Sequence, residues 1–277
     1  MLRLAVRVRG EDAEIVLAEL LELAPGGVEE VELEGGVVEY AVYGPPGELP
    51  ALPDLRAAAG GALIDVSTAE VPDDWDRRWR EFHRPLVLEG RLTVRPPWEP
   101  AGATPLDVVI DPGQAFGTGA HATTRLCLEL LLELASGAVG QHHGELLDLG
   151  CGSGVLAITA ARLGFAPVRA VDNDPASLEA TVANARRNRV ALEVARHDLR
   201  ADPPISAPTV AANLLAPLLV AWAERLGVAS AVPQRVIASG LLVDEAGRVG
   251  QAFVPLGLLE RARREGGGWA ALLLERG

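Results

Sequence analysis

The sequence contains no lysine, only two cysteines and a single methionine among its 277 residues. The cysteines, Cys127 and Cys151, form no CxxC pair and have no histidine at metal-ligand spacing, which predicts reduced thiols and argues against a disulfide framework. No apolar run approaches the ~18 residues of a membrane span. The N-terminus alternates charged and apolar residues, unlike a signal peptide. These absences predict a cytoplasmic protein with no membrane-bound part.

Basic charge is also scarce, since the formal net charge is −13 and the isoelectric point about 4.9. An acidic surface repels phosphate backbones and favours basic partners, so we expect no direct contact with nucleic acid. The 49% hydrophobic and 23% charged content is that of an ordinary globular protein. The length allows one large domain or two unequal ones.

A glycine-rich turn follows a short apolar run near the middle of the chain. Leu146 to Leu149 is typical of a buried parallel strand, and Gly150 to Gly154 then form the turn. Apolar residues at helical spacing follow from Val155 until Gly164. A second strand from Val168 to Val171 places Asp172 at its carboxyl end. This order predicts a nucleoside-binding βαβ unit.

The spacing of the turn indicates which nucleoside would bind. Glycines at 150, 152 and 154 give G-x-G-x-G rather than the G-x-G-x-x-G of dinucleotide sites, and no phosphate-binding lysine follows. Asp148 suits the amino group of S-adenosylmethionine (SAM), and Asp172 suits a ribose diol. We therefore predict a SAM site in which Gly150 and Gly152 let the cofactor approach the backbone. A turn that merely packs the helix on the strand is the alternative.

The first 70 residues follow the order strand, helix, strand, strand, helix, strand. The predicted ranges are 2–9, 11–23, 28–33, 37–42, 54–59 and 62–66. This order predicts a ferredoxin-like α+β domain over residues 1–70, with either a substrate-recognition role or a structural capping role. A charged helical linker rich in tryptophan, residues 71–90, would lead to a SAM methyltransferase domain over residues 91–277.

Further strands are expected in the second domain, at 108–110, 192–195, 209–212, 235–239, 258–264 and 269–275. The last five of these, together with the two strands of the βαβ unit, predict an α/β, seven-stranded, doubly wound Rossmann-like sheet. His197 and Asp198 follow one strand where an adenine amine could be met. His121 precedes a leucine-rich helix that ends near Leu134, so either a helix-capping or a catalytic role is open for it.

The motifs resemble those of the bacterial ribosomal protein L-eleven methyltransferase family over nearly the whole chain. They are the Trp-rich linker, Phe82-His83-Arg84-Pro85, Asp111-Pro112-Gly113, Phe116-Gly117-Thr118-Gly119-Ala120-His121, the glycine turn, Asn213-Leu214-Leu215-Ala216 and Ser239-Gly240. The resemblance implies that Thr124, Gly150, Asp172 and Asn213 contact SAM, and that the loop from Phe116 to His121 borders the methyl-transfer site. It also implies methylation of lysine side chains and of the N-terminal amine of a basic ribosomal protein, guided by the N-terminal domain.

The chemistry of an amine acceptor is compatible with the residues at the end of the predicted fourth strand. The attacking amine must be neutral, and Asn213 could accept its hydrogen bond and stabilise the charge that develops on nitrogen. Nucleic-acid amino-methyltransferases usually carry Asn/Asp-Pro-Pro-aromatic there, whereas this chain has Leu214-Leu215. A methyltransferase of small-molecule or other protein amines and a non-catalytic SAM-binding module are alternatives. We expect a monomer.

Overall fold

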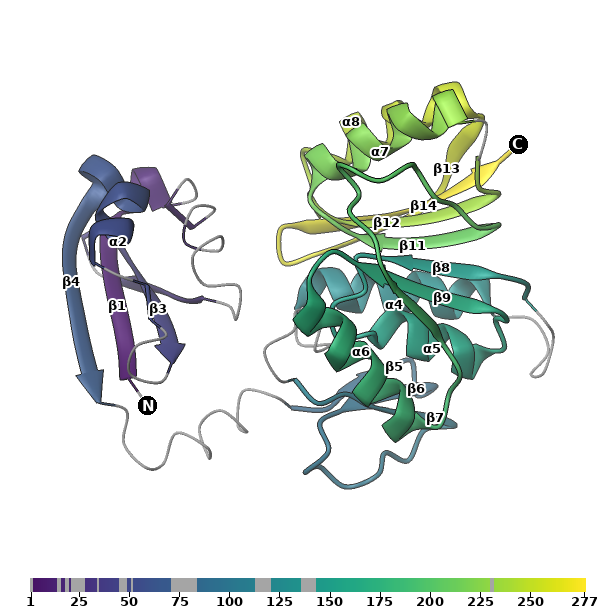
Figure 1. Cartoon of the computed structure of the whole chain (residues 1–277), viewed down its shortest axis with the longest axis horizontal. Helices are drawn as coiled ribbons and strands as arrows, with labels where there is room; N and C mark the ends of the chain where they lie inside the picture. The colour runs from purple at the N-terminus through teal and green to yellow at the C-terminus, as the bar shows by residue number, and fades with distance from the viewer. Residues whose placement is uncertain are drawn as a thin grey trace. The chain divides into compact units, whose positions relative to one another are not determined.

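The computed structural model describes residues 2–13, 16–17, 20, 28–33, 35–44, 49–50, 52–70, 84–112, 121–135, 143–229 and 232–277. The chain divides into two compact units, Met1–Phe82 and His83–Gly277 (Figure 1). The tryptophan-rich part of the predicted helical linker lies outside the described residues. The predicted domain boundaries at residues 70 and 90 stay predictions. Among the helices that are described, none is both long and apolar enough to cross a membrane.

Unit 1 is built on a four-stranded antiparallel sheet. Its strands are β1 (Leu2–Arg9), β2 (Glu29–Leu33), β3 (Val37–Gly44) and β4 (Leu63–Glu70), in the order β2-β3-β1-β4. The predicted strands are confirmed. Apolar side chains on one face of β1, β3 and β4 pack with helix α2 (Leu52–Ala59) and with Val16 and Leu20, whereas Val31 and Leu33 of β2 are exposed. Short 3-10 turns lie at Gly10–Asp12 and Gly60–Ala62.

The opposite face of this sheet holds a buried carboxylate. Glu39 on β3 accepts hydrogen bonds of 2.6 Å from both Arg3 and Arg7 on the neighbouring β1. The two arginines lower the pKa of Glu39, because their guanidinium groups stabilise its ionised form. Charge pairing therefore fixes the register of the central strands on the face that lacks an apolar core.

Unit 2 is organised by a seven-stranded mixed sheet in the order β10-β9-β8-β11-β12-β14-β13. The strands are β8 (Leu146–Leu149), β9 (Val168–Asp172), β10 (Glu193–Arg196), β11 (Thr209–Asn213), β12 (Arg235–Leu242), β13 (Leu258–Gly266) and β14 (Trp269–Arg276). Five adjacent strands run parallel to one another: β10, β9, β8, β11 and β12. Strand β14 is antiparallel to both of its neighbours. The predicted doubly wound sheet is confirmed.

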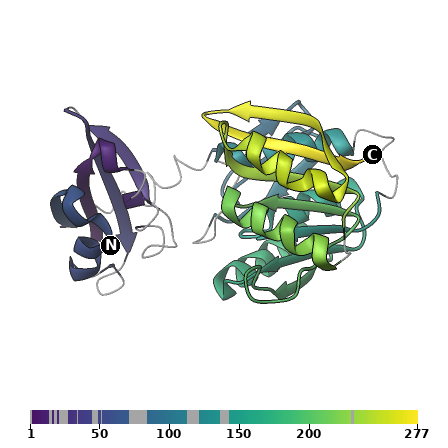
Figure 2. The same ribbon diagram turned by 90° about the horizontal axis from the view of Figure 1, so that it is seen from above.

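Helices cover both faces of this sheet (Figures 1 and 2). The helices α4 (Ala122–Leu134), α5 (Val155–Leu163) and α6 (Pro175–Asn188) pack with one core, which contains Leu146 of β8. The helices α7 (Ala216–Ala229) and α8 (Ala246–Phe253) pack with the other core, which contains Leu147. Adjacent strand residues thus point into opposite cores, as the pleat requires. A 3-10 turn, Val254–Leu256, leads to β13.

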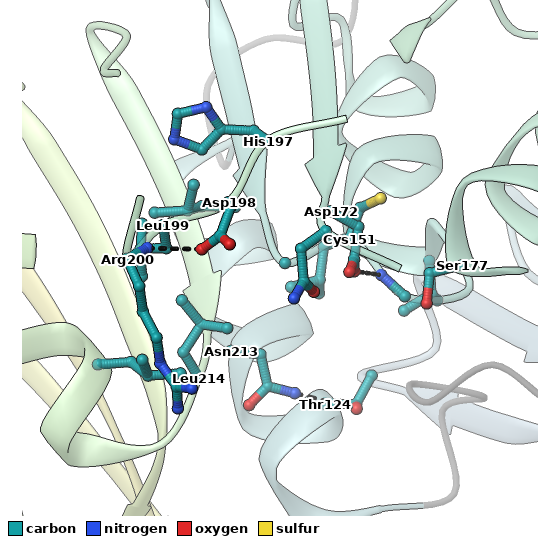
Figure 3. Close-up of a pocket in the computed structure, with 17 residues that line it drawn as sticks. Thr124, Cys151, Asp172, Ser177, His197, Asp198, Leu199, Arg200, Asn213 and Leu214 are labelled. Atoms are coloured by element: carbon teal, nitrogen blue, oxygen red, sulfur yellow. Dashed lines mark hydrogen bonds between the residues drawn. The ribbon is translucent and has the colours of Figure 1, made fainter. Parts of the chain in front are cut away.

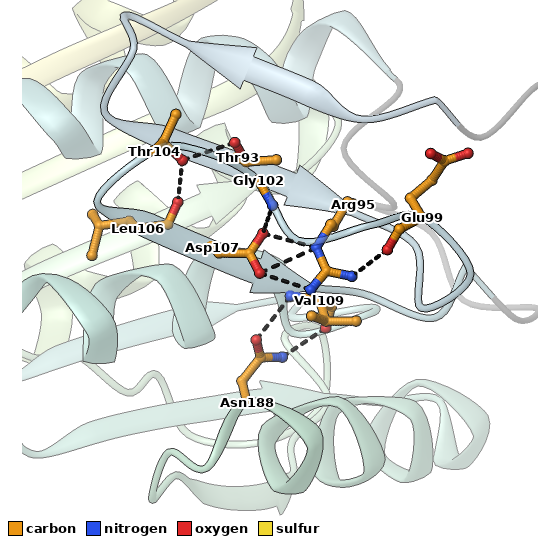
Figure 4. A network of polar contacts seen from close by, with 9 residues as sticks. All are labelled: Thr93, Arg95, Glu99, Gly102, Thr104, Leu106, Asp107, Val109 and Asn188. Carbon is orange, nitrogen blue, oxygen red and sulfur yellow. Dashed lines mark hydrogen bonds and ion pairs between the residues drawn. The ribbon is translucent and has the colours of Figure 1, made fainter.

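A three-stranded sheet, not predicted as such, precedes the large one. It consists of β5 (Leu86–Leu88), β6 (Leu92–Arg95) and β7 (Leu106–Val109). Arg95 pairs with Asp107 on the neighbouring strand at 2.7 Å and donates to the backbone oxygen of Glu99, as Figure 4 shows. The guanidinium lowers the pKa of Asp107. This ion pair closes the loop between β6 and β7.

Candidate functional site

A cavity of about 420 Å³ opens at the carboxyl ends of the central parallel strands (Figure 3). Open α/β sheets bind ligands at this edge, where the strand order reverses between β8 and β11. Apolar and polar side chains share the lining: Leu149, Val155, Leu156, Leu199, Leu214 and Leu218 on one hand, and Thr124, Asp172, Asn173, Ser177, Asp198, Arg200 and Asn213 on the other. This mixture is typical of a site for a polar nucleoside.

The glycine turn forms one wall of the cavity, and its backbone explains its composition. Gly150 and Gly154 have φ values of +78° and +80°, in the left-handed region that favours glycine. A Cβ at Gly150 would lie 2.5 Å from a methyl carbon of Leu214. The backbone N–H groups of Gly150 and Cys151 donate to the oxygen of Val171 at 2.8 and 3.0 Å. The turn is therefore tied to β9 and leaves room for a ligand against its backbone.

Asp172 connects this turn to the start of α6. One carboxylate oxygen accepts from the backbone N–H of Gly152 at 2.9 Å, and the other accepts from Asp174 at 3.1 Å. Asp174 in turn caps α6 by accepting from the N–H groups of Ala176 and Ser177. Each oxygen of Asp172 keeps further acceptor capacity for a ribose diol. The predicted ribose contact remains a prediction, and a structural role of Asp172 is added to it.

Asp148 does not line the cavity, although we predicted that it faces the amino group of SAM. Its side chain is 1% exposed beneath the turn, and Oδ2 accepts from the N–H of Ala157 at 2.9 Å. Oδ1 has no hydrogen-bond partner among the described residues. Burial raises the pKa of Asp148 to about 7, and the negative charge of Asp172 adds to this shift. Its contact with SAM stays a prediction.

Asn213 and Thr124 meet at the other end of the cavity. Asn213 ends β11, and its Nδ2 donates to Oγ1 of Thr124 on α4 at 3.4 Å. Figure 3 shows the amide oxygen of Asn213 on the side away from Thr124. The structure thus brings together two of the residues expected to contact SAM. The orientation leaves Oδ1 as the group that can accept from an amine.

His121 caps α4 and does not line the cavity. Its Nδ1 accepts from the backbone N–H of Thr123 at 3.3 Å, and its ring packs edge-on against Trp269 with centroids 5.1 Å apart. Burial lowers the pKa of His121, which favours the neutral ring. The helix-capping role is confirmed, and a catalytic role remains a prediction. Phe116, the other predicted member of that loop, lies outside the described residues.

The segment after β10 forms the opposite wall. Asp198 lines the cavity, and its Oδ1 accepts from the N–H of Arg200 at 2.8 Å. Backbone hydrogen bonds, chiefly from Arg200, lower the pKa of Asp198. Arg225 on α7 donates to the backbone oxygens of Leu199 and Asp202. These hydrogen bonds from Arg225 hold Leu199 and Arg200 at the cavity. The sequence analysis missed both residues, although they follow the end of a predicted strand.

Two carboxamides on α6 fix the remaining wall from behind. Nδ2 of Asn184 donates to the oxygen of Ser153 at 2.9 Å, while its Oδ1 accepts from the N–H of Asp111 at 2.9 Å. Asn188 exchanges two hydrogen bonds with the backbone of Val109 on β7, at 2.8 and 2.6 Å. Both side chains are buried. They join the glycine turn to the segment that leads into the predicted loop around Phe116.

The site holds acids, amides and hydroxyls, and the described residues contain no group of three or more potential metal-ligating side chains. Such a donor set suits a cationic nucleoside cofactor. Asp172 and Asp198 supply two carboxylates to the lining, against one arginine, Arg200, and His197, whose pKa is lowered by burial. The excess of negative charge favours a ligand that carries a positive sulfur.

Comparisons with known proteins point in the same direction. The family described as "Ribosomal protein L11 methyltransferase (PrmA)" matches residues 56–277. A protein of that name from Pelotomaculum thermopropionicum is 41% identical over 76% of this chain and 69% of its own length. Another from Halorhodospira halophila is 39% identical over 80% and 79%. The crystal structure of a "ribosomal protein L11 methylase" from Lactobacillus delbrueckii subsp. bulgaricus has a TM-score of 0.58 and 27% identity, covering 70% of this chain and 98% of its own.

Proposed function

This chain belongs to the ribosomal protein L11 methyltransferase family, and from that premise we propose that it transfers methyl groups from SAM to amines of ribosomal protein L11. The amines are lysine side chains and the N-terminal amine. The observation that carries the proposal is the pairing of Asn213 with Thr124 at one end of a nucleoside-sized cavity whose other walls carry Asp172 and Asp198.

SAM is the methyl donor, and the residues of the cavity fit it. When bound, it supplies an electrophilic methyl group on a positively charged sulfur. Asp172 would accept from the ribose hydroxyls, Asp198 would accept from the adenine amine, and Gly150 and Gly152 would let the nucleoside lie against the backbone. Leu149, Leu199 and the other apolar lining residues would exclude water from the purine.

The residues near Asn213 would make the amine reactive. A lysine of pKa ~10.4 is neutral only about once in 2,500 at pH 7, which costs ~4.6 kcal/mol. Leu214 and Leu218 line this end of the cavity and would lower that pKa by desolvating the ammonium form. Oδ1 of Asn213 would accept from the amine and stabilise the charge that develops on nitrogen. The proton leaves the product amine to solvent.

We infer that unit 1 is a ferredoxin-like domain that recognises the protein substrate. Its antiparallel order β2-β3-β1-β4 and the element sequence β1, β2, β3, α2, β4 support the ferredoxin-like assignment. A structural capping role is the alternative to recognition. We further propose that the enzyme acts as a monomer, makes no direct contact with nucleic acid and works in the cytoplasm.

The test is incubation of the purified protein with labelled SAM and ribosomal protein L11, followed by mass spectrometry of the substrate. Because the enzyme contains no lysine, any methyl-lysine in the mixture belongs to the substrate. The expected result is methyl-lysine in the ribosomal protein, and loss of labelling in an Asn213→Ala variant. Labelling of free amines at rates equal to those of the protein would favour a small-molecule methyltransferase instead.

A further inference from the structure

Three apolar side chains are exposed at the end of the sheet where Asn213 lies. Leu215 is 63% exposed, and Leu242 and Val243 are each 38% exposed. Leu215 lies just after the end of β11. Leu242 is the last residue of the neighbouring β12, beyond its bulge, and Val243 follows it. We call these three residues the rim. Soluble surfaces carry single exposed apolar residues commonly, but a group of them beside a cavity marks an interaction site.

The backbone beneath the rim is rigid, so its exposure is built into the fold. The N–H of Leu214 donates to the oxygen of Ser239 at 2.9 Å, which locks the two strand ends together. Gly240 has a φ of +84°, and a Cβ there would lie 2.5 Å from the backbone oxygen of Leu214. Only glycine fits so close an approach. The two strand ends can therefore present their side chains side by side.

The turn that carries Leu242 and Val243 is also fixed by hydrogen bonds. The N–H of Leu242 donates to Oε2 of Glu245 at 3.0 Å, and the N–H of Glu245 donates back to the oxygen of Leu242 at 3.0 Å. The N–H of Val243 donates to the oxygen of Gly268 at 3.1 Å. With its backbone groups satisfied, this turn leaves the side chains of Leu242, Val243 and Asp244 toward solvent.

We propose that the rim docks the lysine-bearing segment of the basic protein substrate, a proposal that rests on the function proposed above. An amine that reaches Asn213 brings a four-carbon stem and flanking residues that must cover the adjoining surface. Leu215 follows the cavity residue Leu214 in the chain, and Gly240, two residues before Leu242, lies against the backbone of Leu214. An apolar stem that leaves the cavity at Leu214 would therefore meet the rim.

Charge at the rim selects the kind of partner. Asp244 is exposed, and its carboxylate has no partner among the residues that the structure describes, so it can pair with a cation that flanks the target lysine. Glu245 adds negative charge and pairs with Arg248 at 3.6 Å. A phosphate backbone would be repelled by these acids, whereas a lysine-rich segment of protein would be attracted.

The experiment compares three full-length proteins: wild type, the double variant Leu215→Ser/Leu242→Ser, and the control Val228→Ser. Val228 is 89% exposed near the carboxyl end of α7, and the cavity residue Leu218 lies near the other end of that helix. Steady-state methylation of ribosomal protein L11 gives KM and kcat, and calorimetry gives the affinity for SAM. The double variant should raise KM for the protein at least about fivefold with SAM affinity unchanged, because apolar contacts to the substrate are lost. The control should match wild type.

The outcomes separate the two proposals. A double variant whose KM equals that of wild type overturns the rim as a docking surface. A wild-type protein that binds SAM but leaves ribosomal protein L11 unmethylated contradicts the proposed function itself. Asp244→Asn should also raise KM and make it less sensitive to salt, because one screened attraction is removed. An unchanged salt dependence would overturn the electrostatic part of the proposal.

Discussion

Replacing Asp148 with asparagine should change how the stability of the protein depends on pH. The carboxyl is buried beneath the glycine turn, and burial raises its pKa from the ordinary 3.8 to about 7. Between these two values the unfolded chain has lost the proton while the folded protein keeps it. Unfolding then releases a proton, so the free energy of unfolding falls as pH rises from about 4 to about 7 and is level above that.

The size of the effect follows from the two pKa values. One pKa unit corresponds to ~1.36 kcal/mol, so forcing the ionised carboxylate into the fold costs at most roughly 4 kcal/mol above pH 7. Between pH 5 and pH 8 the free energy of unfolding of the wild type should fall by roughly 2–3 kcal/mol through this carboxyl. Asp148→Asn keeps the shape and the acceptor for the N–H of Ala157 but removes the titration.

The measurement is urea unfolding of both proteins without ligand at pH 5 and pH 8. The stability of Asp148→Asn relative to wild type should rise by roughly 2–3 kcal/mol between the two values. Asp107→Asn is the control, because Arg95 lowers the pKa of Asp107 and its contribution is lost only as pH falls through the more acid range, so its difference from wild type should stay constant between pH 5 and pH 8. A difference between wild type and Asp148→Asn that stays constant with pH would refute the buried, protonated carboxyl.

Three further predictions concern the site and the units. Asn213→Ala should lower kcat by roughly 10²–10³ in single-turnover assays at saturating SAM, because one preorganised acceptor is lost, and near-normal turnover would shift the role to the Phe116 loop. Asp172→Ala should weaken SAM binding at least about tenfold by calorimetry, since charge-assisted hydrogen bonds are lost. It should also lower Tm because the N–H groups of Gly152 and Asp174 lose their acceptor. Unchanged affinity would place the nucleoside elsewhere. A fragment of residues 83–277 should bind SAM yet fail on the intact protein substrate, and full activity on it would refute recognition by unit 1.

The elements that sequence patterns predicted are those with long periodic runs or strong end signals. Gly164 ends α5 in the left-handed conformation, and Asp174 caps α6 ahead of Pro175. Glycines at 35 and 36, with φ values of +84° and +72°, form the turn between the predicted strands at 28–33 and 37–42. Local chemistry decides such features, so a sequence reveals them.

The features that sequence patterns missed depend on contacts between distant segments. Strands β5 and β6 have three and four residues, too few to show a period, and their pairing becomes visible only in the folded sheet. Asn184 and Asn188 are polar residues on a helix, where a sequence suggests a solvated face, yet both are buried. Asp148 is buried beneath the turn, which its place in the sequence does not reveal, and its predicted contact with SAM stays a prediction.

The side chain of Asn184 connects two parts of the site, so it can couple the binding of SAM to the binding of the protein substrate. It holds the glycine turn through Ser153 with one end and the backbone of Asp111 with the other. If a bound nucleoside restrains the turn, we expect it to restrain the segment that leads to the predicted methyl-transfer loop as well. By linkage the protein substrate must tighten SAM binding by the same factor. Asn184→Ala cuts this connection, so binding of the two ligands to that variant should become independent.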